Sequence, residues 1–219
     1  MKLITIGIAI LLLVGCSSTP AEEDTKLSGD AAVEPVVLDK VPEGMATVAY
    51  ELDNMGRDRT QYTFRQDGEL VIDPSNEGKE LARGDIIMFD APPYEQELVP
   101  QQISRVVALS GEKVVLKEGH IWINGEKLQT FYAPATKSGL EREDYIAHMR
   151  KTDSAFQLEG YEGFDEAMEV MTVPDDHYFV IGDNRWRSID SRHFGAIPSE
   201  LVRGKVIGVT EQFSIDSSK

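Results

Sequence analysis

The sequence predicts a mostly β fold, and three observations support this class. Short segments of alternating or continuous apolar residues recur along the chain. Asp-Gly, Ser-Gly and Asn-Gly pairs, which are typical of tight turns, separate several of them. Only residues 139–171 carry apolar residues at a spacing that suits a helix. The 219 residues are enough for one domain with a tail.

Strands are expected wherever apolar side chains alternate between turn residues. The expected strands are 61–65 and 69–72 around Asp67-Gly68, 85–89, 103–109 and 113–116 around Ser110-Gly111, 120–123 before Asn124-Gly125, 177–181 and 205–209. The domain that contains them is expected over residues 44–213. Residues 132–172, with the helix-like stretch, are expected to form an insertion, and residues 214–219 a tail.

The N-terminus has the pattern of a bacterial export signal. Lys2 precedes an apolar run from Leu3 to Val14, which is too short to cross a bilayer as a helix and has the length of a signal-peptide core. The run ends in Leu-Val-Gly-Cys, which resembles the bacterial lipobox, where the cysteine receives a diacylglycerol and signal peptidase II cuts before it. We therefore expect a signal peptide over residues 1–15 and lipidation of Cys16. An ordinary signal peptide or an uncleaved anchor is the alternative.

Residues 16–43 are expected to form a flexible acidic tether. The segment has no aromatic residue and mixes Ser, Pro, Gly and acidic residues, so it can bury little apolar surface. Acyl chains on Cys16 would hold the protein stably on a membrane. The expected location is the extracytoplasmic face of a bacterial membrane.

Composition excludes several classes of partner and cofactor. With 22 basic and 38 acidic side chains, the net charge of −16 disfavours nucleic acid as a partner. A single cysteine permits neither a disulfide framework nor a cysteine-based zinc site. The histidines show no metal-ligand spacing, so no metal and no cofactor is expected. These histidines are His120, His148, His177 and His193.

Four short blocks occur in a fixed order within the expected domain. They read RGDII at 83–87, RVVALSGE at 105–112, IWING at 121–125 and GDNRWRSIDSR at 182–192. Together they resemble signal peptidase I, the membrane-bound serine peptidase of the Ser-Lys type in family S26, over roughly residues 48–210. The resemblance implies a signal peptidase I-like β-fold with a small inserted subdomain that contains some helix. It also implies attack by a serine hydroxyl that a neutral lysine deprotonates.

The resemblance places the nucleophile at Asn54 and the general base at Ser104. Asn54 precedes a methionine, as the family's serine does, and Ser104 precedes Arg105, as the family's lysine precedes an arginine. An amide cannot act as this nucleophile. Arg105 cannot replace the lysine as the base, because its guanidinium stays protonated at working pH. No intact catalytic pair is therefore expected.

A shifted alignment does not recover either residue type. No serine occurs from residue 29 to residue 74, and no lysine occurs from residue 85 to residue 112. Three supporting positions of the family are matched by Ser188, Asp190 and Arg192. They would orient the lysine in an active enzyme, but without the dyad a role in capping and pairing within a turn is favoured.

These observations leave three functional hypotheses. The leading one is a non-catalytic homologue, a pseudoenzyme, that binds peptides or exported proteins at the membrane surface. The second is an active signal peptidase with a repositioned nucleophile and base. The third is a structural cell-envelope lipoprotein. The partners implied are a membrane, through the lipid anchor, and signal peptides, preproteins or an active signal peptidase.

Overall fold

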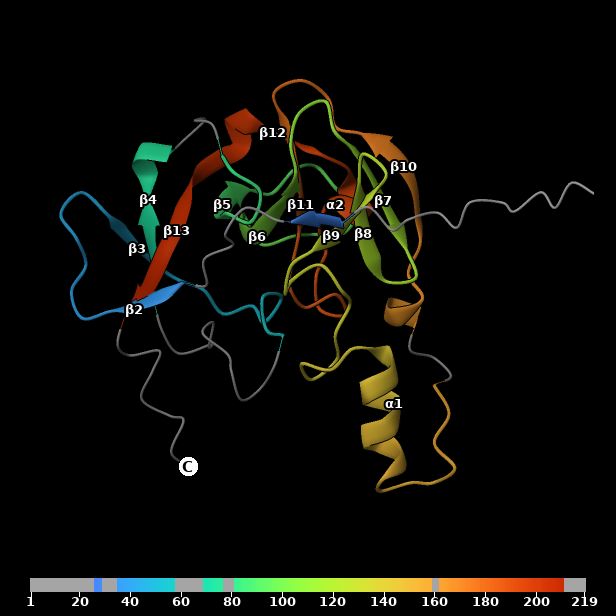
Figure 1. Ribbon diagram of the computed structural model, residues 1–219. Helices are drawn as coiled ribbons and strands as arrows, with labels where there is room; N and C mark the ends of the chain where they lie inside the picture. The colour runs from blue at the N-terminus through green and yellow to red at the C-terminus, as the bar shows by residue number, and fades with distance from the viewer. Residues whose placement is uncertain (1–25, 29–34, 58–68, 77–80, 159–161, 211–219) are drawn as a thin grey trace, which may run out of the picture.

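The computed structural model describes residues 26–28, 35–57, 69–76, 81–158 and 162–210 (Figure 1). The described chain is mostly β, with two sheets and few short helices, which confirms the predicted fold class. The strands are β1 Lys26–Ser28, β2 Val36–Leu38, β3 Ala46–Ala49, β4 Glu69–Asp73, β5 Ile86–Asp90, β6 Gln101–Ala108, β7 Lys113–Lys117, β8 His120–Ile123, β9 Glu126–Gln129, β10 Met168–Thr172, β11 His177–Ile181, β12 Ile197–Pro198 and β13 Val202–Thr210. The α-helices are α1 Arg142–Arg150 and α2 Ser191–Phe194. Three 3-10 turns lie at Pro74–Asn76, Glu162–Phe164 and Ser199–Leu201.

The larger sheet forms the body of the domain. Its strands follow the order β12-β11-β6-β5-β13-β4-β3, and β2 pairs in parallel with the end of β13. Strand β13 pairs with β5 through its first residues and with β4 through its later ones. Two groups of buried apolar side chains pack on this sheet, one around Leu70 and Ile103 and the other around Phe89 and Val106.

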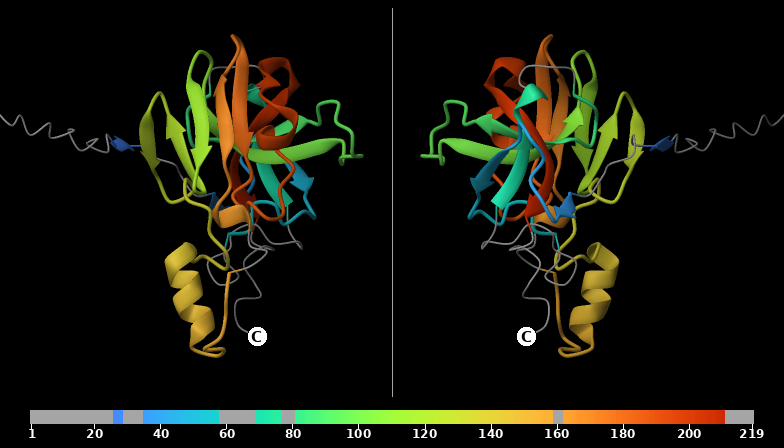
Figure 2. Two further views of the ribbon diagram at one scale, coloured as in Figure 1. Left: turned by 90° about the vertical axis from the view of Figure 1, so that its right-hand side faces the viewer. Right: turned by 90° about the vertical axis from the view of Figure 1, so that its left-hand side faces the viewer.

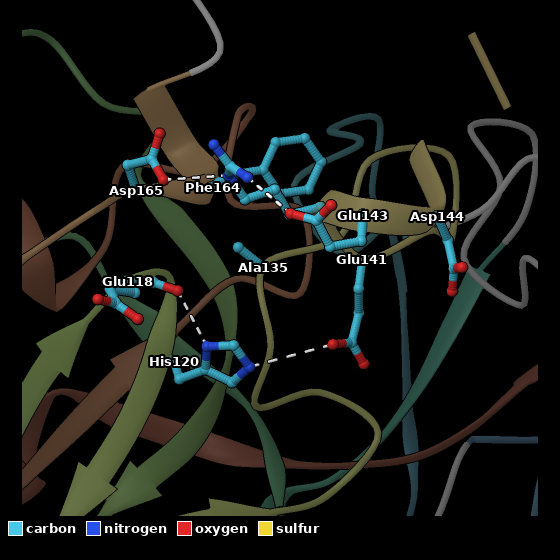
Figure 3. A pocket seen from close by; sticks show the side chains of 9 residues that line it. Glu118, His120, Ala135, Glu141, Glu143, Asp144, Phe164 and Asp165 are labelled. Carbon is cyan, nitrogen blue, oxygen red and sulfur yellow. Dashed lines mark hydrogen bonds and ion pairs between the residues drawn. The ribbon is translucent and has the colours of Figure 1, made fainter. Parts of the chain in front are cut away.

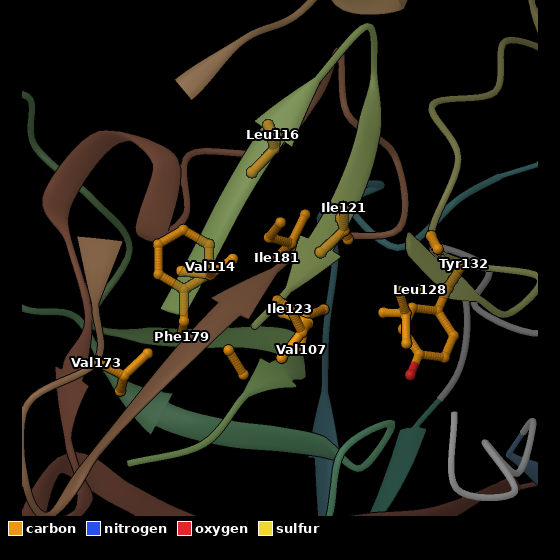
Figure 4. Close-up of a cluster of buried hydrophobic side chains, with 12 residues drawn as sticks. Val107, Val114, Leu116, Ile121, Ile123, Leu128, Tyr132, Val173, Phe179 and Ile181 are labelled. Atoms are coloured by element: carbon orange, nitrogen blue, oxygen red, sulfur yellow. The ribbon is translucent and has the colours of Figure 1, made fainter. Parts of the chain in front are cut away.

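The smaller sheet has the order β1-β9-β8-β7-β10 and packs one face against the body (Figure 4). Side chains alternate across each strand, so Val114 and Leu116 of β7 and Ile121 and Ile123 of β8 point into a shared core with Phe179 of β11. The predicted turn between β8 and β9 is confirmed at Asn124-Gly125. Both of its residues have positive φ, at 53° and 89°, as a two-residue hairpin of this kind requires.

The helix-containing insertion lies below the two sheets in the views of Figures 1 and 2. Helix α1 buries Tyr145 against Phe164 and Ala135, and Trp186 from the body packs against this cluster. We call these four residues and the apolar side chains around them the insertion cluster. The predicted helical segment therefore contains one regular α-helix, followed by a 3-10 turn and strand β10.

All seven predicted strands that fall on described residues are present. The segments 69–72, 85–89, 103–109, 113–116, 120–123, 177–181 and 205–209 correspond to β4, β5, β6, β7, β8, β11 and β13. The expected strand 61–65 and its Asp67-Gly68 turn lie outside the described residues. Within the part of the chain that is described, no helix is long and apolar enough to cross a membrane.

The structure differs from the prediction within residues 16–43. Strands β1 and β2 lie in this segment, which the sequence predicts to be a flexible tether. Strand β1 pairs in parallel with β9, and β2 pairs in parallel with β13. Both partner strands are also held in their sheets by other strands. The physical reason is that an unpaired sheet edge offers backbone donors and acceptors to a short segment, whatever its low hydrophobicity.

Candidate functional site

Asn54 lies in the turn after β3 and is buried, with 4% of its surface exposed. Its side chain joins two parts of the body. The amide nitrogen Nδ2 donates to the Ile103 carbonyl oxygen at 2.7 Å, and the oxygen Oδ1 accepts from the Tyr50 hydroxyl at 2.9 Å. The Tyr50 oxygen in turn accepts from the Ile103 backbone N–H at 3.3 Å. Burial is the main cause that raises the pKa of Tyr50 to about 12, so the hydroxyl stays protonated and donates.

Ser104 lies on β6 directly after the residue that Asn54 contacts. It is 1% exposed and pairs across the sheet with Ile87. The fold thus places the two positions that the resemblance assigns to the dyad next to each other. The Asn54 side chain is hydrogen-bonded to Ile103, the residue before Ser104. Within the described residues, no hydrogen bond joins the two side chains. That these are the nucleophile and base positions stays a prediction.

The backbone of Asn54 is held by the loop that follows β11. Its carbonyl oxygen accepts from the Asn184 backbone N–H at 2.9 Å and lies 2.9 Å from the Ser188 hydroxyl. The same hydroxyl lies 2.7 Å from the Asn184 carbonyl oxygen, so its one proton is shared between two acceptors. The Arg187 guanidinium adds an ion pair of 2.9 Å to Asp53. Ser188 is therefore brought to the predicted site, but its contacts are with backbone.

A glycine makes this close approach possible. A Cβ on Gly182 would lie 1.9 Å from the Ser188 Oγ and 2.8 Å from the Asn54 carbonyl oxygen, which no real side chain tolerates. Gly182 also donates its backbone N–H to the Asp190 carboxylate at 2.9 Å. The requirement for glycine here arises from lack of space.

Asp190 is completely buried and caps helix α2. Its carboxylate accepts from the Arg192 backbone N–H at 3.1 Å and from the Arg192 side chain at 2.8 and 2.9 Å. Burial alone would raise the pKa of Asp190, but Arg192 and the surrounding hydrogen bonds outweigh it and lower the pKa to about 2. The favoured sequence interpretation of Asp190 and Arg192, capping and pairing, agrees with these contacts.

A second carboxylate connects this cap to the insertion. Glu166 accepts from Arg192 at 2.7 and 2.8 Å and lies 3.5 Å from Arg185. Burial would lower the pKa of Arg192, but Asp190 and Glu166 outweigh it and raise this pKa. At Arg185 burial dominates and lowers the pKa to about 10. The two arginines, with Asp190 and Glu166, hold the 182–192 loop as a rigid charged unit.

Arg105 makes a separate buried ion pair. Its guanidinium contacts the Asp183 carboxylate at 2.6 and 2.9 Å and lies 4.8 Å from the Tyr132 ring centroid. It also donates to the Gly84 carbonyl oxygen at 2.8 Å. These contacts fix the start of the 182–192 loop on β6 and give Arg105 a structural role.

Sequence reasoning missed the partners of Asn54. Tyr50 lies four residues earlier in the chain, and Asn184 stands in the GDNR block, which was singled out for other residues. Neither has a motif that predicts a contact with Asn54, because the contact depends on how distant loops meet. The sequence signal available was the family block itself, which marks the whole 182–192 segment as one unit.

A groove of about 610 Å³ lies next to Asn54. One wall is formed by β3 and the following turn, and the other by the ends of β5 and β6. The lining residues are Val48, Ala49, Tyr50, Glu51, Leu52, Met88, Asp90, Val99, Pro100, Gln101 and Ile103. Tyr50 and Ile103 are the two residues that contact the Asn54 side chain, so the groove runs directly to the predicted dyad position. We call this the peptide-sized groove.

A second hollow, of about 520 Å³, lies between the β7–β8 turn and the start of α1 (Figure 3). His120 contacts the Glu118 carbonyl oxygen at 2.9 Å and lies 4.0 Å from the Glu141 carboxylate. Arg142 pairs with Glu143 at 2.7 Å and with Asp165 at 3.3 Å. Among the residues that the structure describes, no group of three or more His, Cys, Asp or Glu is arranged to hold a metal ion.

A known protein family matches most of this chain. The family model described as signal peptidase, peptidase S26, matches residues 46–210. The chain therefore belongs to the S26 signal peptidase family.

Individual relatives carry the same description. Signal peptidase I V of Bacillus subtilis (strain 168) is 27% identical over 177 residues, which cover 80% of this chain and 93% of the relative. Signal peptidase I of Bacillus licheniformis is 32% identical over 126 residues, or 57% of this chain and 56% of that protein. The crystal structure of a signal peptidase I from Enterococcus faecalis V583 aligns with 58% of this chain and 97% of its own, at 29% identity and a TM-score of 0.39.

Proposed function

We propose that this chain is a non-catalytic member of the signal peptidase family that binds extended segments of exported proteins. The observation that carries the proposal is the environment of Asn54. The residue at the predicted nucleophile position is an amide whose nitrogen and oxygen are both engaged in buried hydrogen bonds. No lysine stands at the predicted base position, where Ser104 is 1% exposed. Hydroxyl attack with a lysine base has neither of its participants here.

The peptide-sized groove supports retained binding. Strand β3 ends the order of the larger sheet, so among the described strands its outer edge has no partner. An extended peptide can add to such an edge through backbone hydrogen bonds, and the small side chains of β3 allow close approach. The residues that line the groove are mostly apolar, and Glu51 and Asp90 are the charged ones among them. Asp90 is paired with Arg203. This suits small or apolar peptide side chains.

Anchoring at Cys16 is part of the same proposal. The leucine-valine-glycine-cysteine sequence at residues 13–16 supports lipidation of the cysteine and removal of residues 1–15. The body would then act on the extracytoplasmic face of the membrane, where exported polypeptides emerge. Mass spectrometry of the mature N-terminus tests this step. An unmodified Cys16 or a retained signal segment would contradict it.

A preprotein cleavage assay separates a binding protein from a peptidase. We expect the protein to leave a preprotein intact under conditions in which an S26 signal peptidase removes its signal peptide. Cleavage that persists in the double variant Asn54→Ala and Ser104→Ala would mean that other residues form a repositioned active site. The double change Asn54→Ser with Ser104→Lys tests the alignment from the other direction, because recovered cleavage would place both positions in the site.

Binding is measured by calorimetry with a synthetic peptide from the cleavage region of a signal sequence. Val99 lines the groove and is 44% exposed, so Val99→Glu removes apolar contact without opening a buried core. We expect about a tenfold or greater loss of affinity. Val170→Glu is the matched control, since this valine is 62% exposed on β10 of the other sheet, and affinity should not change.

Two results of this titration would contradict peptide binding in the groove. One is equal affinity for the Val99 and Val170 variants, which would place the peptide elsewhere. The other is no measurable heat or displacement with any cleavage-region peptide. That second result would favour a structural envelope protein.

A further inference from the structure

The outer face of the smaller sheet carries a group of lysines around a tryptophan. Val114, Leu116, Ile121 and Ile123 point inward, so the residues between them point away from the body. The strand register places Val115 opposite Trp122 and Trp122 opposite Lys127. On β7, β8 and β9 the outward residues, besides His120 and Gln129, are Lys113, Val115, Lys117, Trp122 and Lys127. We call these five residues the lysine face.

The lysine face is positive in a chain whose net charge is −16. No ion pair joins Lys113, Lys117 or Lys127 to a carboxylate of any described residue. Lys113 and Lys117 are exposed, and the Lys117 ammonium lies 5.2 Å from the centroid of the Trp122 ring. A half-buried tryptophan beside lysines with long apolar stems is typical of surfaces that lie at the boundary between water and lipid.

The N-terminal segment joins the molecule at this same sheet. Strand β1 lies beside β9 (Figure 2) and pairs with it in parallel. Lys26 is in register with Lys127. Nine residues lie between positions 16 and 26, and the ten steps from one to the other span at most about 36 Å. An acyl anchor at Cys16 would therefore keep the smaller sheet close to the bilayer. This step rests on the anchor included in the proposed function.

We propose that the lysine face docks on anionic lipid headgroups and so fixes the orientation of the domain on the membrane. Charges are screened over about 8 Å at physiological salt, so acidic residues farther than this from the three lysines do not cancel the local attraction. Each lysine near an anionic surface strengthens docking by about fivefold. The peptide-sized groove is on the other sheet and stays open to exported chains in this orientation.

Fluorescence of Trp122 in the full-length protein tests the docking. The chain has two tryptophans, so Trp186→Phe leaves Trp122 as the reporter. The protein is reconstituted in vesicles of brominated phosphatidylcholine, with or without phosphatidylglycerol. Bromine quenches a tryptophan that touches the acyl region. We expect strong quenching in the phosphatidylglycerol vesicles and little in the neutral ones.

Paired charge variants show whether the lysine face is responsible. Lys117→Gln with Lys127→Gln should weaken docking about 25-fold and remove most of the quenching. Lys40→Gln with Lys151→Gln removes the same charge from exposed positions on other parts of the molecule, and it should leave quenching unchanged. Equal quenching in neutral and anionic vesicles, or equal effects of the two double variants, would overturn the proposal.

The anchor and the lysine face can fail separately. If mass spectrometry finds no acyl group on Cys16, the anchor fails, and the same vesicles are added to the protein from outside. Quenching that requires phosphatidylglycerol then still supports the lysine face, and absence of quenching overturns it. A short DNA duplex that displaces the vesicles and binds more tightly than they do would also overturn the assignment to lipid.

Discussion

At the scale of single residues, Asp190 holds more interactions than any other carboxylate of the site. It receives donors from Gly182 and Arg192 and begins helix α2, all without contact with solvent. A buried charge of this kind is favourable only while its partners remain in place. Its role in the fold is therefore independent of whether a lysine stands nearby.

Asp190→Asn should destabilise the protein by about 3 kcal/mol at neutral pH, because Arg192 loses its buried counter-charge. The pKa of Asp190 falls from 3.8 in the unfolded chain to about 2 in the fold. Its stabilising contribution, about 2 to 3 kcal/mol, is thus present above pH 4 and is lost as the pH falls through 2. The variant should lose less stability than the wild type over this range.

Urea unfolding at a series of pH values measures both effects. Asp165→Asn is the control, since Asp165 is 63% exposed and pairs only with Arg142 among the described residues; its stability should stay within about 0.5 kcal/mol of the wild type. A stable Asp190→Asn variant with an unchanged pH profile would refute the role assigned to this carboxylate.

At the scale of elements, the loop between β11 and α2 determines where the turn after β3 lies. Gly182, Asn184 and Ser188 approach the Asn54 backbone, and Arg187 pairs with Asp53. These contacts are made largely by backbone groups and by small residues. The geometry of the turn therefore depends on the loop as well as on the two hydrogen bonds of the Asn54 side chain.

Gly182→Ala should cost about 3 kcal/mol or more, because the added methyl group overlaps the Ser188 hydroxyl. Gly111→Ala is the matched comparison: a Cβ there meets nothing within 4 Å, and the left-handed backbone at φ 81° should cost only about 1 to 2 kcal/mol. Thermal unfolding of the two variants measures the difference. Equal losses would mean that the loop can move away from Asn54 at little cost.

The strands could be predicted from the sequence where their own pattern was sufficient. β8 and β11 begin and end where alternation and turn residues place them. β3 was missed because Ala46–Ala49 has little apolar character of its own and is held by pairing with β4. β1 and β2 were missed for the same reason, since their positions are determined by the edges of β9 and β13.

The candidate site was predictable only in part. The family blocks led to Asn54, Ser104, Ser188 and Asp190, and the fold brings Asn54 against β6 and Ser188 against Asn54. The role of Tyr50 could not be read from the chain, because its hydroxyl meets Ile103, 53 residues later in the sequence, through the tertiary fold. The groove was likewise unpredictable in its lining, since it depends on the distance between β3 and the ends of β5 and β6.

At the scale of the whole molecule, the insertion is joined to the body through Trp186. The Trp186 ring lies 4.9 Å from the Phe164 ring and 5.4 Å from the Lys137 ammonium. Helix α1 adds Tyr145 to the same insertion cluster. This small cluster is separate from the cores of the two sheets, so the insertion can loosen without unfolding of the sheets.

Trp186→Ala should increase amide hydrogen exchange in α1 by roughly 100-fold, which corresponds to about 3 kcal/mol of lost packing. Exchange in β5 and β6 should change little. Trp122→Ala, on the outer face of the smaller sheet, serves as the control and should leave α1 unaffected. Equal acceleration throughout the chain would show that the insertion and the sheets unfold together.

The backbone contacts of Asn54 bear on which substitutions this turn can accept. The carbonyl oxygen of residue 54 is held by Asn184 and Ser188, and these two contacts do not involve the side chain of residue 54. On the proposed alignment, substitutions at residues 54 and 104 alone would therefore remove or restore the dyad residues while these backbone contacts stay in place.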